Sequence, residues 1–284
     1  MISDLRTDMA IELADMAQCG APETRQEGDC RIDRLTVDEK TAEKIGKPRG
    51  SYITLSFVGK DLRSTDTFRS IVTALAQQLR SLLKEGPVLV ACLGNTDITP
   101  DAIGPKTAEH VIATRHLIHT IPEYFADFRP VCVFSPGVLG NTGMESAELI
   151  GCALRCCGAK TVIAIDALAA VNTELLCAGV QLTDTGICPG SGVGNRRSRI
   201  SRDTLGVDVI AVGVPTVTDG GSLAADMLRK IGSDAAPDFP TGLIVTPKDI
   251  DMKISQLSRL VGFAVNLALH EGLTLEEIAD LLAV

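Results

Sequence analysis

Two aspartates, Asp101 and Asp166, stand where a carboxylate can do chemistry. Asp166 closes the apolar run TVIAID, and Asp101 lies in the loop GNTDITPDAIGP that follows the apolar run VLVACL. A charged carboxylate at the end of a buried strand is costly unless it is paired or used in a reaction. A single such aspartate is more often a helix cap or a turn residue. Two of them at buried strand ends favour a shared site.

Two carboxylates held close together have a simple chemistry. They cannot both ionise easily, so one apparent pKa rises. The charged partner can then activate a water molecule while the protonated partner donates to a leaving group. The same oxygens suit a divalent metal, with Asp97, Asp101 and Asp166 as ligands. The residues alone leave three readings open: an acid–base hydrolase, a metal-dependent hydrolase, and a binding protein without catalysis.

A second candidate region is the long loop TDTGICPGSGVGNRRSRISRDTLG, which follows Leu182. It is rich in glycine, but no Gly-Lys-Ser/Thr follows, so it is not a P-loop for phosphate. Its arginines can bind a substrate carboxylate through paired hydrogen bonds, or they can form a solvated basic surface. The candidate substrate-binding residues are Asn95, Arg196, Arg197 and Arg199.

The elements that must position these residues alternate between apolar runs and helical patterns. We predict strands over 51–58, 88–93, 131–134, 161–166 and 207–214, with a short one near 243–246. Helices are predicted over 65–84 and 107–120, from a capping box at 142–145 to 157, and from about 254, with a break near Gly272 and a new N-cap at Thr274. Continuous apolar strands separated by helices predict an α/β fold with a mostly parallel sheet flanked by helices. Ligands bind at the carboxyl ends of such strands.

The polar first fifty residues differ in character from the rest. We expect residues 1–50 to form an N-terminal, propeptide-like arm and surface segment, and residues 51–284 to form a single α/β catalytic domain. The predicted site lies wholly within the second part.

Composition excludes several function classes. The 284 residues include 27 Lys and Arg against 36 Asp and Glu, a net charge of −9, and aromatic residues make up 3 %. Direct nucleic-acid binding needs a positive surface, which this balance disfavours. The sequence shows neither a secretory signal nor an apolar run of about 18 residues, which predicts a cytoplasmic protein without membrane association. Nine irregularly spaced cysteines favour buried thiols over disulfides.

Several long blocks of the sequence are unusual: RTDMAIELAD, GNTDITPDAIGP, FSPGVLGNTGMES, VIAIDALAA, QLTDTGICPGSGVGN, TLGVDVIAVGVPTV and VTPKDID. Together, from about Arg6 to the C-terminal helices, they resemble the germination protease family, an atypical group of aspartic endopeptidases from endospore-forming bacteria. The resemblance implies a hydrogenase-maturation-protease-like fold in the phosphorylase/hydrolase-like α/β group, and no cofactor. The family's two catalytic aspartates fall on Asp101 and Asp166.

The resemblance also implies a biology. Its substrates are small acid-soluble spore proteins, cut after a Glu during germination in the spore core, and its members are made as zymogens that assemble into homotetramers. Family precursors carry a propeptide ahead of the Arg-Thr-Asp block, whereas five residues precede Arg6 here. We therefore expect a nearly absent propeptide or a chain close to the mature form. The loop arginines are the expected binding site for the substrate Glu. The alternatives are a metal-dependent maturation-type protease on the same fold and a catalytically inactive binding protein.

Overall fold

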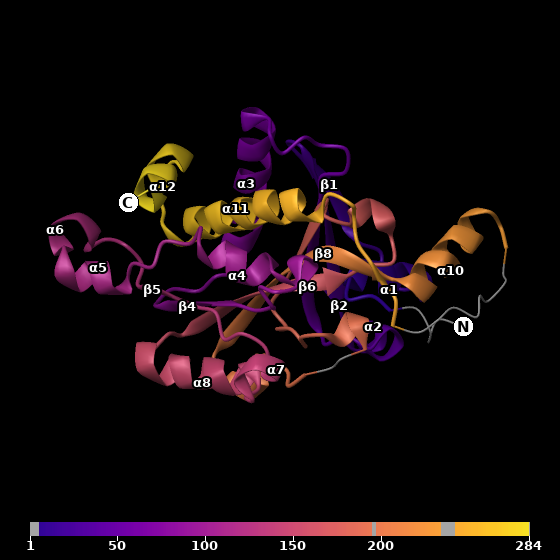
Figure 1. Cartoon of the computed structure of the whole chain (residues 1–284), viewed down its shortest axis with the longest axis horizontal. Helices are drawn as coiled ribbons and strands as arrows, with labels where there is room; N and C mark the ends of the chain where they lie inside the picture. Colours follow the sequence, from indigo (N-terminus) through magenta and orange to yellow (C-terminus); the bar gives the residue numbers. More distant parts are fainter. Residues whose placement is uncertain (1–5, 195–196, 234–241, 284) are drawn as a thin grey trace.

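A single mixed sheet forms the centre of the protein (Figure 1). The computed structural model describes residues 6–194, 197–233 and 242–283. In this part of the chain the sheet has nine strands in the order β1-β2-β3-β7-β8-β6-β4-β5, with β9 paired to β8. The strands are β1 (Glu23–Glu27), β2 (Cys30–Val37), β3 (Gly50–Ser56), β4 (Val88–Cys92), β5 (Val131–Phe134), β6 (Thr161–Ala169), β7 (Gly179–Thr183), β8 (Asp208–Asp219) and β9 (Ile244–Val245).

The α/β class is confirmed, but the sheet is less parallel than the sequence suggests. Strands β5, β4, β6 and β8 run parallel to one another, whereas β1, β2, β3 and β7 are joined by antiparallel pairings. Strand β7 is buried along its whole length, as a parallel strand would be, and yet it is antiparallel to β3 and β8. Burial along the whole length of a strand therefore does not determine its direction.

The first fifty residues are part of the sheet, which differs from the expected surface arm. Strand β2 pairs with β3 across the expected boundary, from Arg31 opposite Ser56 to Val37 opposite Gly50. Cys30 and Ile32 lie in the main core, whereas Leu35 and Val37 belong to a separate core cluster; of the charged residues between them, Arg31 is exposed and Asp33 is buried. Those charges made the segment read as surface. The buried positions include both even-numbered and odd-numbered residues, so this strand contacts apolar residues on both faces of the sheet and has no simple alternation with a period of two.

Helices cover both faces of the sheet. In Figure 1, α4 and α11 lie above the strands and α8 lies below them. Helices α3 and α11 pack together on the first face, and α8 contributes Ile150 and Leu154 to a second core on the other. The helices are α1 (Ala10–Met16), α2 (Glu39–Ile45), α3 (Thr65–Arg80), α4 (Ile103–Ala108), α5 (Arg115–Thr120), α6 (Pro122–Phe125), α7 (Leu139–Thr142), α8 (Ser146–Cys157), α9 (Arg202–Leu205), α10 (Gly220–Lys230), α11 (Ile250–Leu269) and α12 (Leu275–Leu282).

Two helix predictions need correction. The helix expected over 107–120 is divided, because α4 ends at Ala108 and α5 begins at Arg115. The helix expected to open at a cap on Thr142 begins later, at Ser146. Gly143 takes a left-handed conformation that ends the short α7, and the Glu148 carboxylate accepts the N–H of Glu145 at 3.0 Å. The cap at Thr274, which opens α12, is confirmed.

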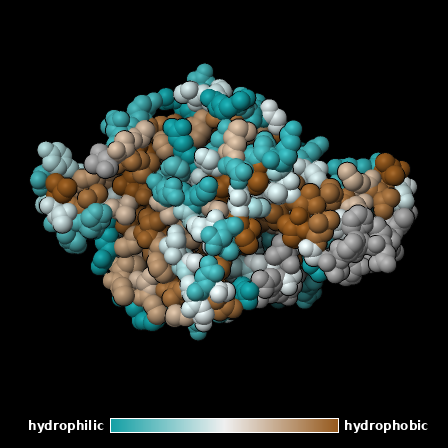
Figure 2. Space-filling model, in the orientation of Figure 1, coloured by the Kyte–Doolittle hydropathy of each residue, from teal (hydrophilic) through white to brown (hydrophobic). Residues whose placement is uncertain are grey.

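The helices, the cysteines and the surface of the described residues each bear on a prediction or on the function. Across the described ranges, no helix has the length and apolarity needed to cross a membrane. All nine cysteines are free, but the prediction that they are buried is only partly correct: Cys30, Cys92 and Cys177 are buried, whereas Cys152 and Cys156 are exposed. Exposed apolar side chains gather on and next to α10, where Figure 2 shows brown surface at the right of the molecule. These side chains are Met227, Ile231, Leu243 and Ile244.

Candidate active site

Asp101 and Asp166 line the same cavity, which has a volume of about 370 Å³. We call it the aspartate cavity. Asp166 lies in the C-terminal half of β6, directly after Ile165, which is in register with Cys92 at the end of the neighbouring parallel strand β4. Beyond β4 the chain loops through a short 3-10 turn, Thr99–Asp101, that carries the second carboxylate back over the sheet edge. Two residues 65 positions apart thus meet at one end of adjacent strands.

Two glycines make the tight path of this loop possible. Gly94 has a φ of 120°, and a Cβ added there would lie 1.9 Å from the carbonyl oxygen of Asp101. At Gly104 an added Cβ would lie 2.0 Å from the carbonyl oxygen of Leu93 and 2.8 Å from that of Ile165. A side chain at either position would push the loop away from the ends of β4 and β6. The glycines therefore set the position of Asp101 relative to Asp166.

Asp101 is the more readily ionised of the two aspartates. Burial raises the pKa of Asp101 to about 6. The backbone N–H of Asn95 donates to its Oδ2 at 2.9 Å, which lowers the pKa and offsets part of that rise.

Asp166 is more deeply buried, with 5 % of its surface exposed. Burial raises the pKa of Asp166 well above its ordinary value, and the negative charges of Asp101 and Asp8 raise it further. A hydrogen bond of 2.9 Å from the N–H of Ala167 acts in the opposite direction. At neutral pH the arrangement favours a charged Asp101 beside a protonated Asp166, with one proton held by the pair.

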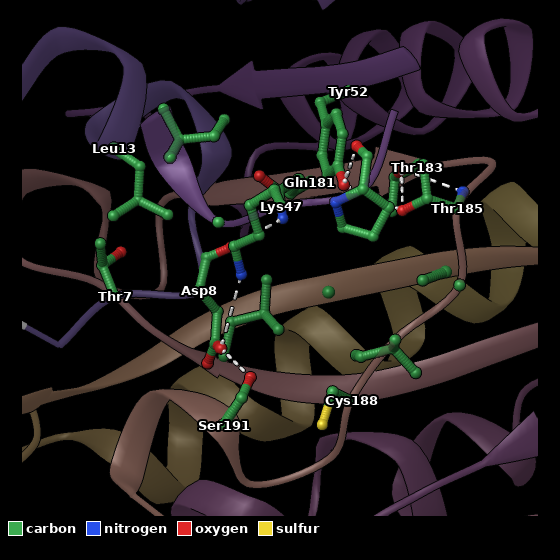
Figure 3. Close-up of a pocket in the computed structure, with 18 of the residues that line it drawn as sticks. Thr7, Asp8, Leu13, Lys47, Tyr52, Gln181, Thr183, Thr185, Cys188 and Ser191 are labelled. Carbon is green, nitrogen blue, oxygen red and sulfur yellow. Dashed lines mark hydrogen bonds and ion pairs between the residues drawn. The ribbon is translucent and has the colours of Figure 1, made fainter. Parts of the chain in front are cut away.

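A third carboxylate, Asp8, also lines the aspartate cavity. It is buried, and its Oδ2 accepts the N–H of Ala169 at 3.0 Å. Its Oδ1 accepts the hydroxyl of Ser191 at 2.5 Å (Figure 3). Sequence reasoning missed this residue, because an acidic residue in a polar N-terminal stretch has no distinctive spacing. The only available signal was its place inside the block RTDMAIELAD.

The rest of the wall combines an apolar surface with an available hydroxyl. Val138, Leu139 and Val217 contribute apolar side chains. Thr216 is fully buried, and its Oγ1 has no hydrogen-bond partner among the residues that the structure describes. A buried hydroxyl in this state is available to a bound water or to a substrate carbonyl. An apolar wall with a few polar groups is typical of a ligand-binding cavity.

The other predicted site residues are distributed around this cavity. Asn95 is not among the lining residues, and it contacts Asp101 through its backbone while its side-chain oxygen accepts the N–H of Asp97 at 3.0 Å. Arg197 lines the aspartate cavity, whereas Arg199 lines a neighbouring one. Arg196 lies outside the described residues. The loop arginines therefore do not form one cluster on the aspartate pair.

The expected metal alternative finds no ligand set. Asp97 is exposed and does not line the aspartate cavity. Within residues 6–194, 197–233 and 242–283, no group of three or more His, Cys, Asp or Glu residues is placed to hold a metal ion. The structure thus brings Asp101 and Asp166 together but leaves Asp97 apart from them.

Comparisons with known proteins give a consistent family. A family model described as germination protease matches residues 12–235. The germination protease of Caldanaerobacter subterraneus subsp. tengcongensis is 35 % identical over 321 residues, which cover 99 % of each chain. That of Bacillus cereus is 40 % identical over 343 residues, which cover 94 % of each chain. Among solved structures, a [NiFe] hydrogenase maturation protease from Thermococcus kodakarensis aligns at 14 % identity with a TM-score of 0.36, covering 66 % of this chain and 98 % of that one.

Proposed function

Because this chain belongs to the germination protease family, we propose that it is an endopeptidase whose water nucleophile is activated by Asp101 and Asp166. One observation carries the proposal. The two carboxyl groups line a single cavity, and both have raised pKa values, one by burial and the other by burial and by its neighbour's charge. Such perturbed, coupled carboxyls are typical of general acid–base pairs.

The difference between the two environments supports a division of roles, with Asp101 as the base and Asp166 as the acid. Charged Asp101 removes a proton from a water molecule, whose oxygen bonds to the carbonyl carbon of the scissile peptide. Asp166 donates its proton to the amide nitrogen, and the C–N bond breaks to release a carboxylic acid and an amine. The pair ends with one proton, now on Asp101, and returns to its starting state by proton exchange. The hydroxyl of Thr216 is placed to orient the water or the substrate carbonyl.

The proposed substrates are the small acid-soluble proteins of the bacterial spore, cut after a Glu during germination. The family resemblance supports this substrate class, and it also supports a cytoplasmic location in the spore core. The apolar wall and the neighbouring cationic side chains of the described residues suit a polypeptide with an acidic side chain. No cofactor enters the proposed reaction.

The proposed assembly is a homotetramer, with a zymogen stage before germination. The support for both comes from the family resemblance. The exposed apolar side chains on and next to α10 (Met227, Ile231, Leu243 and Ile244) offer a surface that association would bury.

Digestion of a purified spore-type protein tests the proposed activity. We expect cleavage at a small number of bonds, each following a Glu, when the products are identified by mass spectrometry. A substrate in which those Glu residues are replaced by Gln should remain intact for much longer. If the native substrate is bound but never cut, the chain is a binding protein and the proposed activity is wrong.

A further inference from the structure

Two thiols from different elements meet on the side of the sheet that α8 covers. Cys132 lies on β5, at the edge of the sheet, and Cys157 is the last residue of α8. Helix α8 packs on β5, and both cysteines pack against the second core. The Cys132 thiol donates a hydrogen bond to the Cys157 sulfur, and the Cys157 thiol donates to the Leu154 carbonyl at 3.9 Å. Two thiols in such contact need only small side-chain rotations to form an S–S bond.

The surroundings of this pair are those of reactive thiols. Both sulfurs belong to partly exposed residues, unlike the three cysteines in the core. The Arg115 guanidinium donates to the Cys156 carbonyl at 3.4 Å, at the C-terminal end of α8, so a cation lies beside the pair. Partial exposure and a neighbouring cation are typical of cysteines that react with oxidants.

The hydrogen bond between the thiols gives them different roles. Burial raises the pKa of Cys132, and the charge of Cys157 and the hydrogen bond to it raise that pKa further, whereas Arg115 lowers it. Cys132 therefore keeps its proton in the reduced pair. Cys157 is the thiol available to attack an oxidant, and Cys132 is placed to react with it afterwards.

The chain between the two cysteines builds one wall of the aspartate cavity. Residues 137–139 and 145–146 line that cavity, and all of them lie between Cys132 and Cys157 in the sequence. The wall is attached to the fold at its two ends, through the pairing of β5 with β4 and through the packing of α8. A covalent bond between the two thiols would therefore close this wall segment into a loop at its two points of attachment.

We propose that Cys132 and Cys157 form a modification site, in which a peroxide converts the two thiols into a reversible disulfide that clamps the wall segment, residues 132–157. A small-molecule or protein dithiol would reverse the step by thiol–disulfide exchange. Such a transient bond is the kind that a reducing compartment allows. The proposal concerns the cross-link and its effect on folding, so it holds or fails independently of the proposed peptidase activity.

The oxidation consumes one hydrogen peroxide for each thiol pair. The Cys157 thiolate, its proton released to solvent, attacks one peroxide oxygen. The O–O bond breaks, hydroxide leaves and takes up a proton to become water, and Cys157 becomes a sulfenic acid. The Cys132 sulfur then bonds to the Cys157 sulfur, the S–O bond breaks, and the hydroxyl leaves with the Cys132 proton as a second water. The two sulfurs together lose two electrons, which reduce the peroxide.

Peptide mapping of the full-length chain tests the site. The reduced chain is treated with a small excess of hydrogen peroxide, its remaining thiols are alkylated in denaturant, and the tryptic peptides are identified by mass spectrometry. Trypsin leaves Cys132 in one peptide with Cys152, and Cys157 in another with Cys156. The mapping is therefore also done on Cys152→Ser/Cys156→Ser, where a link between these two peptides can only join Cys132 to Cys157.

We expect this double variant to form the linked peptides, as the wild type does, and to recover both thiols after dithiothreitol. Its unfolding midpoint should be about 5 °C or more higher when oxidised than when reduced, because the bond restricts the unfolded chain. Cys157→Ser and Cys132→Ala should each lose the link and the rise in midpoint. Their far-UV circular dichroism, compared with that of the reduced wild type, shows that they are folded.

Two arginine variants test the surroundings of the pair. Arg115→Gln removes the cation beside the thiols and should slow disulfide formation roughly two- to fivefold, which is the effect expected of one exposed charge. Arg155→Gln is the matched control, because its guanidinium contacts Cys152 instead, at 3.0 Å. It should leave the rate unchanged.

Two outcomes would overturn the proposal. In one, folded Cys152→Ser/Cys156→Ser keeps both thiols under peroxide, or carries them as separate sulfenic or sulfinic acids. In the other, the linked chain has the same unfolding midpoint as the reduced chain, so that the bond clamps nothing. A linked, stabilised chain that cleaves no spore-type protein would support this site while contradicting the proposed function.

Discussion

Asp101 and Asp166 face one cavity from the ends of two neighbouring parallel strands, and the charge of Asp101 raises the pKa of Asp166. A backbone N–H stabilises the charge on Asp101, while Asp166 is nearly closed off from water. The proposed mechanism uses this asymmetry, with one carboxyl acting as the base and the other as the acid at the same pH.

The pH dependence of cleavage should follow from this asymmetry. Below about pH 6, Asp101 gains a proton and cannot act as a base, so kcat/KM should fall about tenfold per pH unit toward acid. At higher pH the pair loses its shared proton, and the rate should fall again as Asp166 ionises. Initial rates on a fluorogenic peptide between pH 4 and 10 give the profile. A rate that stays constant from pH 4 to pH 7 is incompatible with Asp101 as the base.

Asp166 should lower stability at neutral pH. The pKa of Asp166 is raised in the folded state. The stability that this raised pKa contributes is therefore fully present below the pKa of the unfolded chain, near 3.8, and is lost as pH rises through the folded pKa. The Asp166→Asn side chain stays neutral at every pH. The free energy of unfolding of this variant, minus that of the wild type, should therefore be larger at pH 8 than at pH 4 by on the order of 1 kcal/mol or more. Urea unfolding at both pH values measures the gain.

A control variant in the same region sharpens this test. Asp97→Asn removes an exposed carboxylate from the Asp101 loop. It gives the reference change in stability, at each pH value, for losing an exposed carboxylate. If Asp166→Asn behaves like Asp97→Asn, then Asp166 is not held in the environment that the structure shows.

Gly104 should be irreplaceable in the loop that carries Asp101. Its added Cβ would meet the backbone of Leu93 and Ile165, so Gly104→Ala should cost about 1–3 kcal/mol of stability and reduce cleavage by displacing Asp101. At Gly140, in α7, an added Cβ meets nothing within 4 Å. Gly140→Ala should leave both quantities unchanged within error. Equal effects of the two substitutions, by thermal unfolding and peptide cleavage, would remove this account of the loop.

His270 should make the protein sensitive to acid. It is buried against Phe128, neither ring nitrogen has a partner in the described structure, and burial lowers its pKa to about 4. Because the pKa of His270 is lower in the folded chain, the stability it contributes is fully present above the pKa of the unfolded chain, 6.5, and is lost as pH falls through the folded pKa. The free energy of unfolding of His270→Phe, minus that of the wild type, should therefore be larger at pH 5 than at pH 8 by on the order of 2 kcal/mol. A constant difference across this range would show that the pKa of His270 is the same in the folded and unfolded chains, contrary to the buried environment described here.

The sequence predicted the centre of the fold better than its edges. Strands β4, β6 and β8 each contain an apolar run that is buried in the sheet. Such a run gives a clear local signal for a buried strand. Strand β2 was missed because charged residues interrupt its apolar residues, which belong to two different core clusters and so show no simple alternation. The direction of β7 depends on which neighbours it meets, and pairing between distant segments leaves no local signal.

The site shows the same division. Asp101 and Asp166 were identified because a carboxylate after a buried strand is costly and therefore conspicuous. Asp8 was missed because its importance comes from a tertiary contact with Ala169 and Ser191, more than 150 residues away. The arginine cluster was predicted from composition alone, and the fold separates Arg197 from Arg199 into different cavities.

Cleavage by the single amide variants is the most direct test of the central claim, which is that Asp101 and Asp166 together activate the nucleophilic water. The initial rates of wild type, Asp101→Asn and Asp166→Asn are compared on a spore-type protein, with and without EDTA, and each chain's folding is checked by its unfolding midpoint. We expect each folded variant to lose at least about 10³-fold in rate, because one member of an acid–base pair contributes little alone, and we expect EDTA to leave the wild-type rate unchanged. A folded variant that cuts at the wild-type rate would contradict the account.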